Sequence, residues 1–305
     1  MPRTRVKRWQ LNMDVTDDAE YVGTLETLSR GSVRRRFDPY IDIDWNAPEF
    51  AVTPNDPRWV LPFTDPLGRH PWYTAQPLEK QIAIGMWRQA NLAKVTLQLE
   101  SILIRGLMQY TFLAPNGSPE YRYCLHESVE ECNHTMMFQE LVNRLAVDVS
   151  GMPRWLRRLS PVLPLAAGPL PILFFFGVLA GEVPIDHIQK NALRGDVSLH
   201  PVMRKVMAIH VAEEARHMSF AHEYLRKRVP NMPLSTRFLL SLCVPIITRV
   251  LGQAIVVPPR SFFKEFHIPR SVRRDLLLEA PTTALDGFRK GASLHDDIAR
   301  PQRAP

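Results

Sequence analysis

Residues 130–134 read Glu-Glu-Cys-Asn-His and residues 213–217 read Glu-Glu-Ala-Arg-His, so the sequence contains the pattern Glu-x-x-His twice. A helix turns about 100° per residue, so a glutamate and a histidine three positions apart lie on one face and can bind the same ion. One such pattern is common on surface helices. Two copies on separate long helices are typical of a four-helix bundle that binds two metal ions in its core.

A bundle of this kind needs one further inward-pointing glutamate from each of its other two helices. Glu100 stands alone in the apolar stretch LQLESILI, and Glu182 follows FFFGVLAG in the same way. An isolated carboxylate is costly to bury unless a positive charge compensates it. Four carboxylates would balance two divalent ions, and oxygen with nitrogen ligands suits iron or manganese. The predicted ligands are Glu100, Glu131, His134, Glu182, Glu214 and His217.

A third histidine extends this set. His210 lies one turn before Glu214 and two turns before His217, so all three face the same way. We expect His210 to be a third imidazole ligand, which gives seven predicted metal-binding and catalytic residues. The equivalent position on the other motif helix is Glu127, which we expect to lie behind the ligands or on the surface.

Three more acidic residues flank the predicted ligands. Glu130 and Glu213 point about 100° away from the ligand face, so we expect them to pair with nearby arginines. Asp186 lies one turn after the third-helix glutamate and is a candidate acceptor for the N–H of a ligand imidazole.

The pattern of apolar residues along the chain predicts an all-α fold. Five long stretches carry apolar residues at helical spacing, and no strand pattern or nucleotide-binding glycine motif occurs. The predicted helices span residues 78–113, 119–147, 170–193, 200–228 and 235–256. We divide the chain into an extended, proline-rich arm packed on the core (1–77), a helical metal-binding domain (78–260), and short helices with a polar tail (261–305).

Composition limits the functions that the chain can have. The net charge is +7, but no basic stripe with interleaved aromatic residues occurs, so nucleic-acid binding is not expected. Three cysteines without a C-x-x-C pair argue against a disulfide framework and favour a reducing compartment. The N-terminal sequence MPRTRVKRWQLNMD has no apolar stretch behind its charges, which favours a cytoplasmic protein over a secreted one.

The uncharged stretch from Pro161 to Gly181 is long enough to be considered as a membrane span. Four prolines interrupt it, and the continuous part from residue 172 to residue 181 is too short to cross a bilayer. A buried core helix is therefore expected here, and membrane contact is not.

With these motifs, the sequence resembles the di-iron N-oxygenases related to p-aminobenzoate N-oxygenase (AurF-like). The resemblance rests on the seven predicted ligands, with His210 as its distinguishing mark, and extends to the arm sequence FDPYIDIDWNAPEF. It implies a ferritin-like four-helix bundle, a homodimer, and oxygenation of a small-molecule amine by dioxygen at two iron ions or a manganese–iron pair. An external reductase or ferredoxin would supply electrons, because no flavin or nicotinamide motif is present.

Three other functions fit part of the pattern. Soluble acyl-carrier-protein desaturases or hydroxylases share the paired motifs, but His210 would be an unexplained addition. A ferritin-like storage or oxidase protein would use similar ligands without a substrate pocket, and a catalytically silent membrane-associated bundle is the last alternative. A substrate carboxylate would need a cation, for which Arg270, Arg273 and Arg289 are candidates.

Overall fold

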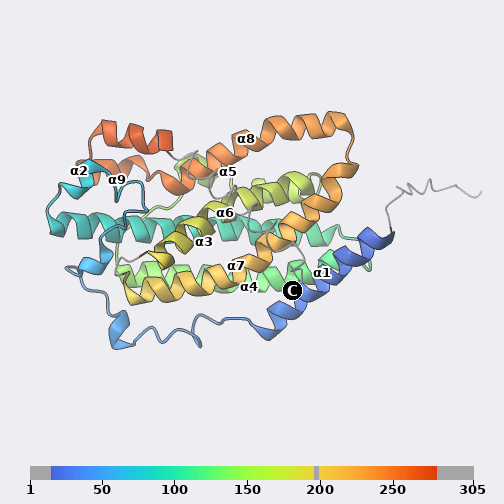
Figure 1. The fold of residues 1–305 in the computed structure, drawn as a ribbon, viewed down its shortest axis with the longest axis horizontal. Helices are drawn as coiled ribbons and strands as arrows, with labels where there is room; N and C mark the ends of the chain where they lie inside the picture. Colours follow the sequence, from blue (N-terminus) through green and yellow to red (C-terminus); the bar gives the residue numbers. More distant parts are fainter. Residues whose placement is uncertain (1–14, 196–198, 280–305) are drawn as a thin grey trace, which may run out of the picture.

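The structure is a computed structural model that describes residues 15–195 and 199–279. Every regular element within these two ranges is helical, which confirms the predicted all-α fold (Figure 1). The helices are α1 (Val15–Arg34), α2 (Pro71–Thr74), α3 (Leu78–Phe112), α4 (Pro119–Leu145), α5 (Arg154–Leu159), α6 (Pro171–Arg194), α7 (Pro201–Arg228), α8 (Leu234–Val256) and α9 (Arg260–Glu265). Residues 270–279 are also helical. The five predicted long helices agree with α3, α4, α6, α7 and α8 to within about two residues at each end.

Four of these helices form the bundle. Helix α3 packs along α4, and α6 packs along α7. A long crossover, which contains α5 and the 3-10 helix η3 (Leu163–Ala167), joins the two pairs. Helices α4, α6 and α7 each begin at a proline, whose fixed φ suits the first helical position. This arrangement of two helical hairpins joined by a crossover is ferritin-like.

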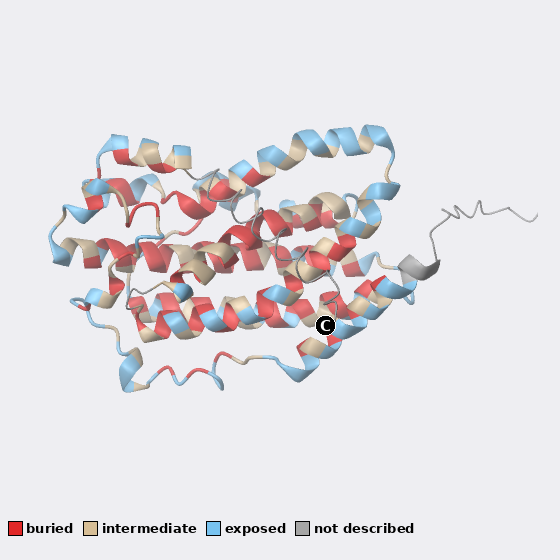
Figure 2. Ribbon diagram, in the orientation of Figure 1, coloured by how far each residue is buried: buried red, intermediate tan, exposed pale blue. Residues whose placement is uncertain are grey.

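Two helices are long and apolar enough to cross a membrane by length and composition alone. Helix α6 is one of them, and 61% of its most apolar window is buried in the bundle, as expected for a core helix. The second begins with α8, and only 33% of its window is buried (Figure 2). The predicted buried helix is wrong for residues 161–170, because Val162, Leu165 and Leu170 are exposed in the crossover.

The N-terminal region differs from the extended arm that we expected. Residues 15–34 form helix α1, which packs against α4 and α7. Its buried positions are Tyr21, Leu25, Ser29 and Ser32, which recur at helical spacing. Two of the four are serines, so the apolar periodicity that predicts a helix is weak in the sequence. Residues 1–14 and the predicted tail over 280–305 lie outside the described residues.

Residues 35–77 contain only short helical turns, and they pack on the bundle. Ile43, Trp45 and Leu61 are buried in the same hydrophobic cluster as side chains of α3, α4 and α7. The ring of Trp59 stacks on His200 at the start of α7, with 4.4 Å between ring centroids. The division of the chain at residues 77 and 260 remains a proposal.

Candidate metal centre

All four bundle helices contribute to one cluster of buried acids and histidines. Glu100 comes from α3, Glu131 and His134 from α4, Glu182 from α6, and His210, Glu214 and His217 from α7. Each of these seven side chains is at most 2% exposed. Six of them form two overlapping groups in which the potential ligand atoms lie within 4.8 Å of one another.

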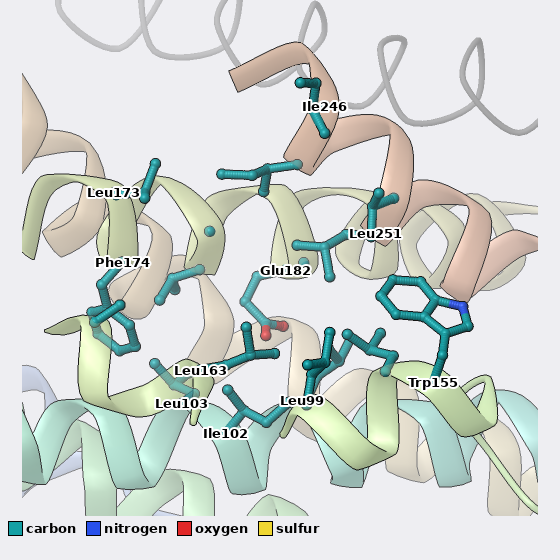
Figure 3. Close-up of a pocket in the computed structure, with 18 residues that line it drawn as sticks. Leu99, Ile102, Leu103, Trp155, Leu163, Leu173, Phe174, Glu182, Ile246 and Leu251 are labelled. Carbon is teal, nitrogen blue, oxygen red and sulfur yellow. The ribbon is translucent and has the colours of Figure 1, made fainter. Parts of the chain in front are cut away.

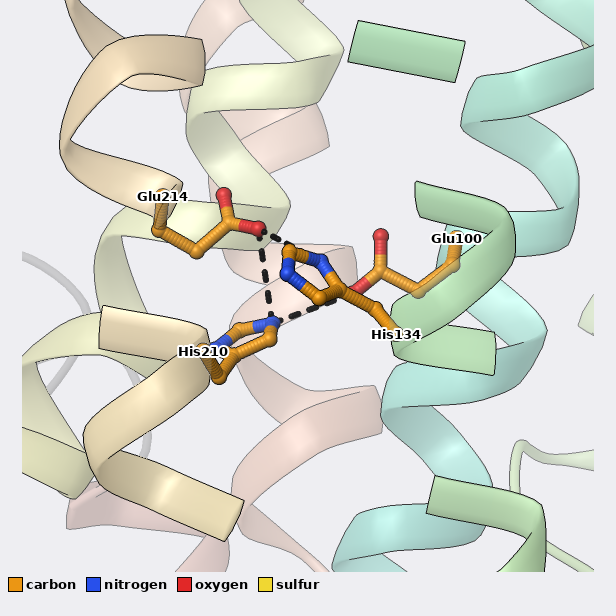
Figure 4. Close-up of side chains that lie close together, drawn as sticks. All are labelled: Glu100, His134, His210 and Glu214. Carbon is orange, nitrogen blue, oxygen red and sulfur yellow. Dashed lines mark hydrogen bonds and ion pairs between the residues drawn. The ribbon is translucent and has the colours of Figure 1, made fainter. Parts of the chain in front are cut away.

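The first group contains Glu100, His134, His210 and Glu214 (Figure 4). The Nε2 atom of His210 lies 3.2 Å from Glu100 Oε1 and 3.4 Å from Glu214 Oε1. Ligand atoms about 2.1 Å from a shared ion are about 3 Å apart, so these spacings suit one metal ion. The structure therefore brings His210 to the position that helical register predicts.

The second group contains Glu131, His134, Glu214 and His217. The Nδ1 atom of His217 lies 2.7 Å from Glu131 Oε1 and 3.2 Å from Glu214 Oε1. The Nδ1 atom of His134 lies 3.2 Å from Glu131 Oε2 and 3.3 Å from Glu214 Oε1. Glu214 and His134 belong to both groups, so the two groups adjoin each other. A carboxylate can serve two neighbouring ions, whereas one imidazole nitrogen binds a single ion.

Glu182 belongs to neither group in this structure. It is buried on α6, and its carboxylate lies at the wall of an apolar pocket (Figure 3). Burial, together with the charges of Glu214 and Glu131, raises the pKa of Glu182 well above its ordinary value. Glu182 is therefore close enough to the cluster to interact with its charges.

Glutamates of the opposite helix hold the far nitrogens of two imidazoles. His134 on α4 places Nε2 3.0 Å from Glu213 Oε2 on α7, and His217 on α7 places Nε2 2.8 Å from Glu130 Oε2 on α4. Arg216 pairs with both glutamates, at 2.7 Å from Glu130 and 3.3 Å from Glu213, as the sequence predicted for an arginine partner. The contacts of Glu213 with His134 and of Glu130 with His217 were not predicted from the sequence. These contacts fix the orientations of the two imidazole rings.

The third imidazole has a neutral partner. His210 Nδ1 lies 2.9 Å from Gln189 Oε1 on α6. The role expected for Asp186 is not observed in the described structure, because Asp186 instead pairs with Lys190 one turn along the same helix at 2.8 Å. The surface alternative for Glu127 is also wrong, because that side chain is only 1% exposed.

The chemistry of the cluster fits a pair of cations. One carboxylate oxygen each of Glu100, Glu182 and Glu214 is buried without a hydrogen-bond partner among the described residues. Leaving such an atom without a donor or cation is costly, and bound metal would compensate it. Burial and the charge of Glu131 raise the pKa of Glu100 well above its ordinary value. Burial lowers the pKa of His210 to about 4, which keeps its imidazole neutral and able to bind metal.

The chain is similar to known proteins over most of its length. A family model described as P-aminobenzoate N-oxygenase AurF matches residues 18–297. Uncharacterized proteins of Mycobacterium tuberculosis and Mycobacterium bovis are each 70% identical to this chain over 282 residues, which cover 92% of this chain and 83% of theirs. The family match spans all four helices of the bundle together with the seven clustered residues. The chain therefore belongs to the p-aminobenzoate N-oxygenase AurF family.

Proposed function

We propose that this protein is a non-haem di-iron oxygenase that uses dioxygen to oxygenate the nitrogen of an aromatic amine. The observation that carries the proposal is the pair of overlapping ligand groups that share Glu214 and His134, with His210 as a third imidazole. Membership of the AurF family supports the same function. The proposed metal-binding and catalytic residues are Glu100, Glu131, His134, Glu182, His210, Glu214 and His217.

Two bound iron ions, or a manganese–iron pair, would supply the reduction of dioxygen and the transfer of an oxygen atom. Conversion of an amine to a hydroxylamine consumes one dioxygen, two electrons and two protons, and it releases water. The electrons would come from an external reductase or ferredoxin. A homodimer is the expected assembly.

The residues of the chain would bind, orient and shield the reacting groups. Four carboxylates would neutralise two divalent ions, and Glu130, Glu213 and Gln189 would keep the three imidazoles in the orientation for binding. Complete burial of the cluster excludes water, which strengthens every electrostatic interaction inside it. Because Glu182 lies at the wall of the apolar pocket, substrate would approach the centre from that side.

Oxidation of an acyl chain is the second candidate. The apolar pocket beside Glu182 favours it, because an alkyl chain needs no polar partner there. His210 favours N-oxygenation, since a third imidazole distinguishes the AurF resemblance from the desaturase one.

The test is product analysis with the purified full-length chain. We would load it with ferrous iron, measure iron per chain, and supply isotopically labelled dioxygen, a chemical reductant, a panel of aromatic amines and a fatty-acyl carrier substrate. Labelled hydroxylamine, nitroso or nitro products support the proposal. Desaturated or hydroxylated acyl chains with every amine untouched would assign the second candidate, and uptake of many irons per chain without organic product would indicate storage.

A further inference from the structure

An apolar cavity of about 290 Å³ lies between the crossover, α3, α6 and α8, and it extends to Glu182 (Figure 3). Leu99 and Leu103 come from α3, Phe174 from α6, and Leu251 from α8. Among the described residues that line the cavity, Glu182 is the only one with an ionisable side chain. The cavity thus begins at the candidate metal centre, and its wall is almost entirely apolar. A ligand would therefore be recognised there mainly through apolar contacts.

From this lining we infer, on the basis of the proposed function, that the substrate is an uncharged aromatic amine with an apolar substituent and without a carboxylate. A carboxylate buried here would meet no cationic side chain among the described lining residues, so the loss of its hydration would not be compensated by the lining. Arg270 and Arg273, which the sequence suggested as carboxylate partners, do not line the cavity, and Arg289 lies outside the described residues. Aromatic amines remain neutral at pH 7, so they can enter such a cavity without loss of charge solvation.

The glycines of α6 provide a direct test. A Cβ atom added at Gly177, which lines the cavity, would meet no atom within 4 Å, so the backbone there has room for a side chain, and a leucine would occupy part of the cavity. Gly23 on α1 is a matched control, because it is also helical and open but lies on the exposed side of another helix. Replacing glycine by leucine at either position favours the helix.

Binding is measured without oxygen on the iron-loaded full chain, by calorimetry with 4-butylaniline, butylbenzene and p-aminobenzoate. We expect 4-butylaniline to bind at least tenfold more tightly than p-aminobenzoate, butylbenzene to bind as well, and Gly177→Leu to weaken both apolar ligands at least tenfold. Gly23→Leu should bind like the parent chain. Equal binding of p-aminobenzoate, or no effect of Gly177→Leu, would overturn the inference. If 4-butylaniline binds as expected but is not oxidised under oxygen, the proposed function fails while the inference about the cavity stands.

A separate observation concerns the surface around the mouth of the cavity. Side chains of the crossover and of α8 form an exposed apolar face, defined by Trp155, Leu159, Leu163, Phe238, Leu242 and Ile246. Trp155 is 50% exposed and Ile246 is 64% exposed, and both line the cavity. The exposed length of α8 is visible in Figure 2. Leu159 and Leu163 line the same cavity, and Phe238 and Leu242 lie two turns and one turn before Ile246 on α8. Exposed apolar side chains that gather in this way indicate a binding surface.

The charged residues of the two segments that carry this apolar face have one sign. Residues 154–170 and 234–256 contain five exposed arginines and no acidic residue: Arg154, Arg157, Arg158, Arg237 and Arg249. Two copies of this face would bring like charges together, which disfavours a symmetric contact with a second copy. Tryptophan, leucine and phenylalanine beside arginine suit the boundary between lipid headgroups and acyl chains.

We propose that the apolar face rests on an anionic lipid surface, from which an apolar substrate enters the cavity. This proposal departs from the expectation from the sequence, in which residues 161–181 were considered as a membrane span and membrane contact was not expected. Insertion of leucine and phenylalanine side chains would supply apolar burial, and the five arginines would pair with anionic headgroups.

Vesicle flotation tests the proposal with the full chain. We expect binding to vesicles of phosphatidylcholine with about one-third phosphatidylglycerol, and binding at least tenfold weaker to phosphatidylcholine alone. Arg157→Glu with Arg158→Glu, and separately Phe238→Ser with Leu242→Ser, should each reduce binding at least fivefold. Arg34→Glu with Arg35→Glu, exposed arginines outside the face, should reduce it less than twofold. No binding to anionic vesicles, or equal loss in the control, would overturn the proposal. A dimer that Phe238→Ser with Leu242→Ser dissociates would assign the face to a second copy.

Discussion

At the scale of single residues, the histidines present different nitrogens to the candidate metal centre. His134 and His217 bond glutamates through Nε2, so Nδ1 faces the clustered carboxylates. His210 has the opposite orientation, because Gln189 contacts its Nδ1 and Nε2 faces Glu100. A charged acceptor makes an imidazole a stronger metal ligand than a neutral acceptor does. His134 and His217 should therefore contribute more to metal affinity than His210 does. His210 belongs to one ligand group only, so it should make the two ion sites chemically different.

The first prediction tests these imidazole partners. Replacing Glu213 by alanine removes the group that holds His134 Nε2 at 3.0 Å, so we expect affinity for ferrous iron to fall about 10- to 100-fold. Glu213→Gln retains an acceptor and should lose less. The measurement is competition with a coloured chelator at pH 7. Glu140→Ala is the control, because Glu140 pairs with Arg144 away from the cluster. Equal affinity in Glu213→Ala and Glu140→Ala would contradict the role of Glu213.

These residues also show how far sequence reasoning reaches at this scale. The period of the helix brings His210 into line with Glu214, and the structure confirms that alignment. The same reasoning gives the offset of Glu130 and Glu213 from the ligand face. It could not find their contacts with His217 and His134, because those contacts join two helices and depend on how α4 and α7 are placed against each other.

At the scale of elements, the contact between the arm and α3 depends on a glycine. A Cβ atom added at Gly85 would lie 1.8 Å from the carbonyl oxygen of Trp59, so the arm backbone must pack directly on the helix. We predict that Gly85→Ala lowers the free energy of unfolding by about 1–3 kcal/mol and exposes the arm to protease at Arg58. Gly23→Ala should be neutral or stabilising, because nothing lies within 4 Å of that position. Urea unfolding and limited proteolysis measure the two effects, and a stable, protease-resistant Gly85→Ala variant would refute this account of the contact.

A partly buried ion pair connects helices at the other end of the bundle. Glu120 on α4 accepts hydrogen bonds from Tyr21 on α1 at 3.1 Å and from Arg228 on α7 at 2.8 Å. Burial alone would raise the pKa of Glu120, but the hydrogen bonds of Ser118 and Arg228 hold it below its ordinary value. A carboxyl with a lowered pKa stabilises the fold above its unfolded pKa of about 4.3, and this contribution disappears as the pH falls through the folded pKa.

We therefore predict a pH-dependent effect of Glu120→Gln. At pH 7 the substitution should reduce the free energy of unfolding by roughly 1.5–3 kcal/mol, since it weakens hydrogen bonds to a charged group. The difference from the parent chain should shrink as the pH falls below about 4.3. Urea unfolding from pH 7 to pH 3 measures it, with Glu140→Gln as the control on the same helix. A difference that stays constant over this range would show that the charge of Glu120 contributes nothing.

Elements differ in how well the sequence predicts them. Three of the four bundle helices begin at a proline and α3 begins directly after one, and all carry clear periodicity, so their bounds follow from the sequence. Helix α1 was missed because Ser29 and Ser32 occupy half of its buried stripe. The apolar pattern of α8 predicts a helix but does not predict that much of it is exposed. Its exposure depends on which other helices pack against it, and this follows only from the tertiary structure.

At the scale of the whole molecule, the buried carboxylates of the candidate metal centre lower the stability of the metal-free fold. Four bundle helices meet at buried carboxylates, three of which have an oxygen without a hydrogen-bond partner among the described residues. Such groups favour unfolding unless a cation compensates them. Because the packing of α3, α4, α6 and α7 excludes water from the site, we expect bound metal to increase the stability of the bundle.

The last prediction follows from this dependence. With free ferrous iron at about 100 times its dissociation constant, binding to the folded state alone adds about 2.7 kcal/mol, which corresponds to a rise in Tm of roughly 3–5 °C for a chain of 305 residues. Calorimetry without oxygen, with iron and then with excess chelator, measures the rise. Glu214→Ala removes the carboxylate shared by both ligand groups and should abolish it, whereas Glu140→Ala should retain it in full. If Glu214→Ala keeps the iron-dependent rise, the ion that stabilises the protein binds elsewhere and the two overlapping groups are not its site. If neither the parent chain nor Glu140→Ala shows an iron-dependent rise in Tm, protons compensate the buried carboxylates. The proposed oxygenase would then lose its metal centre, while the helical fold would stand.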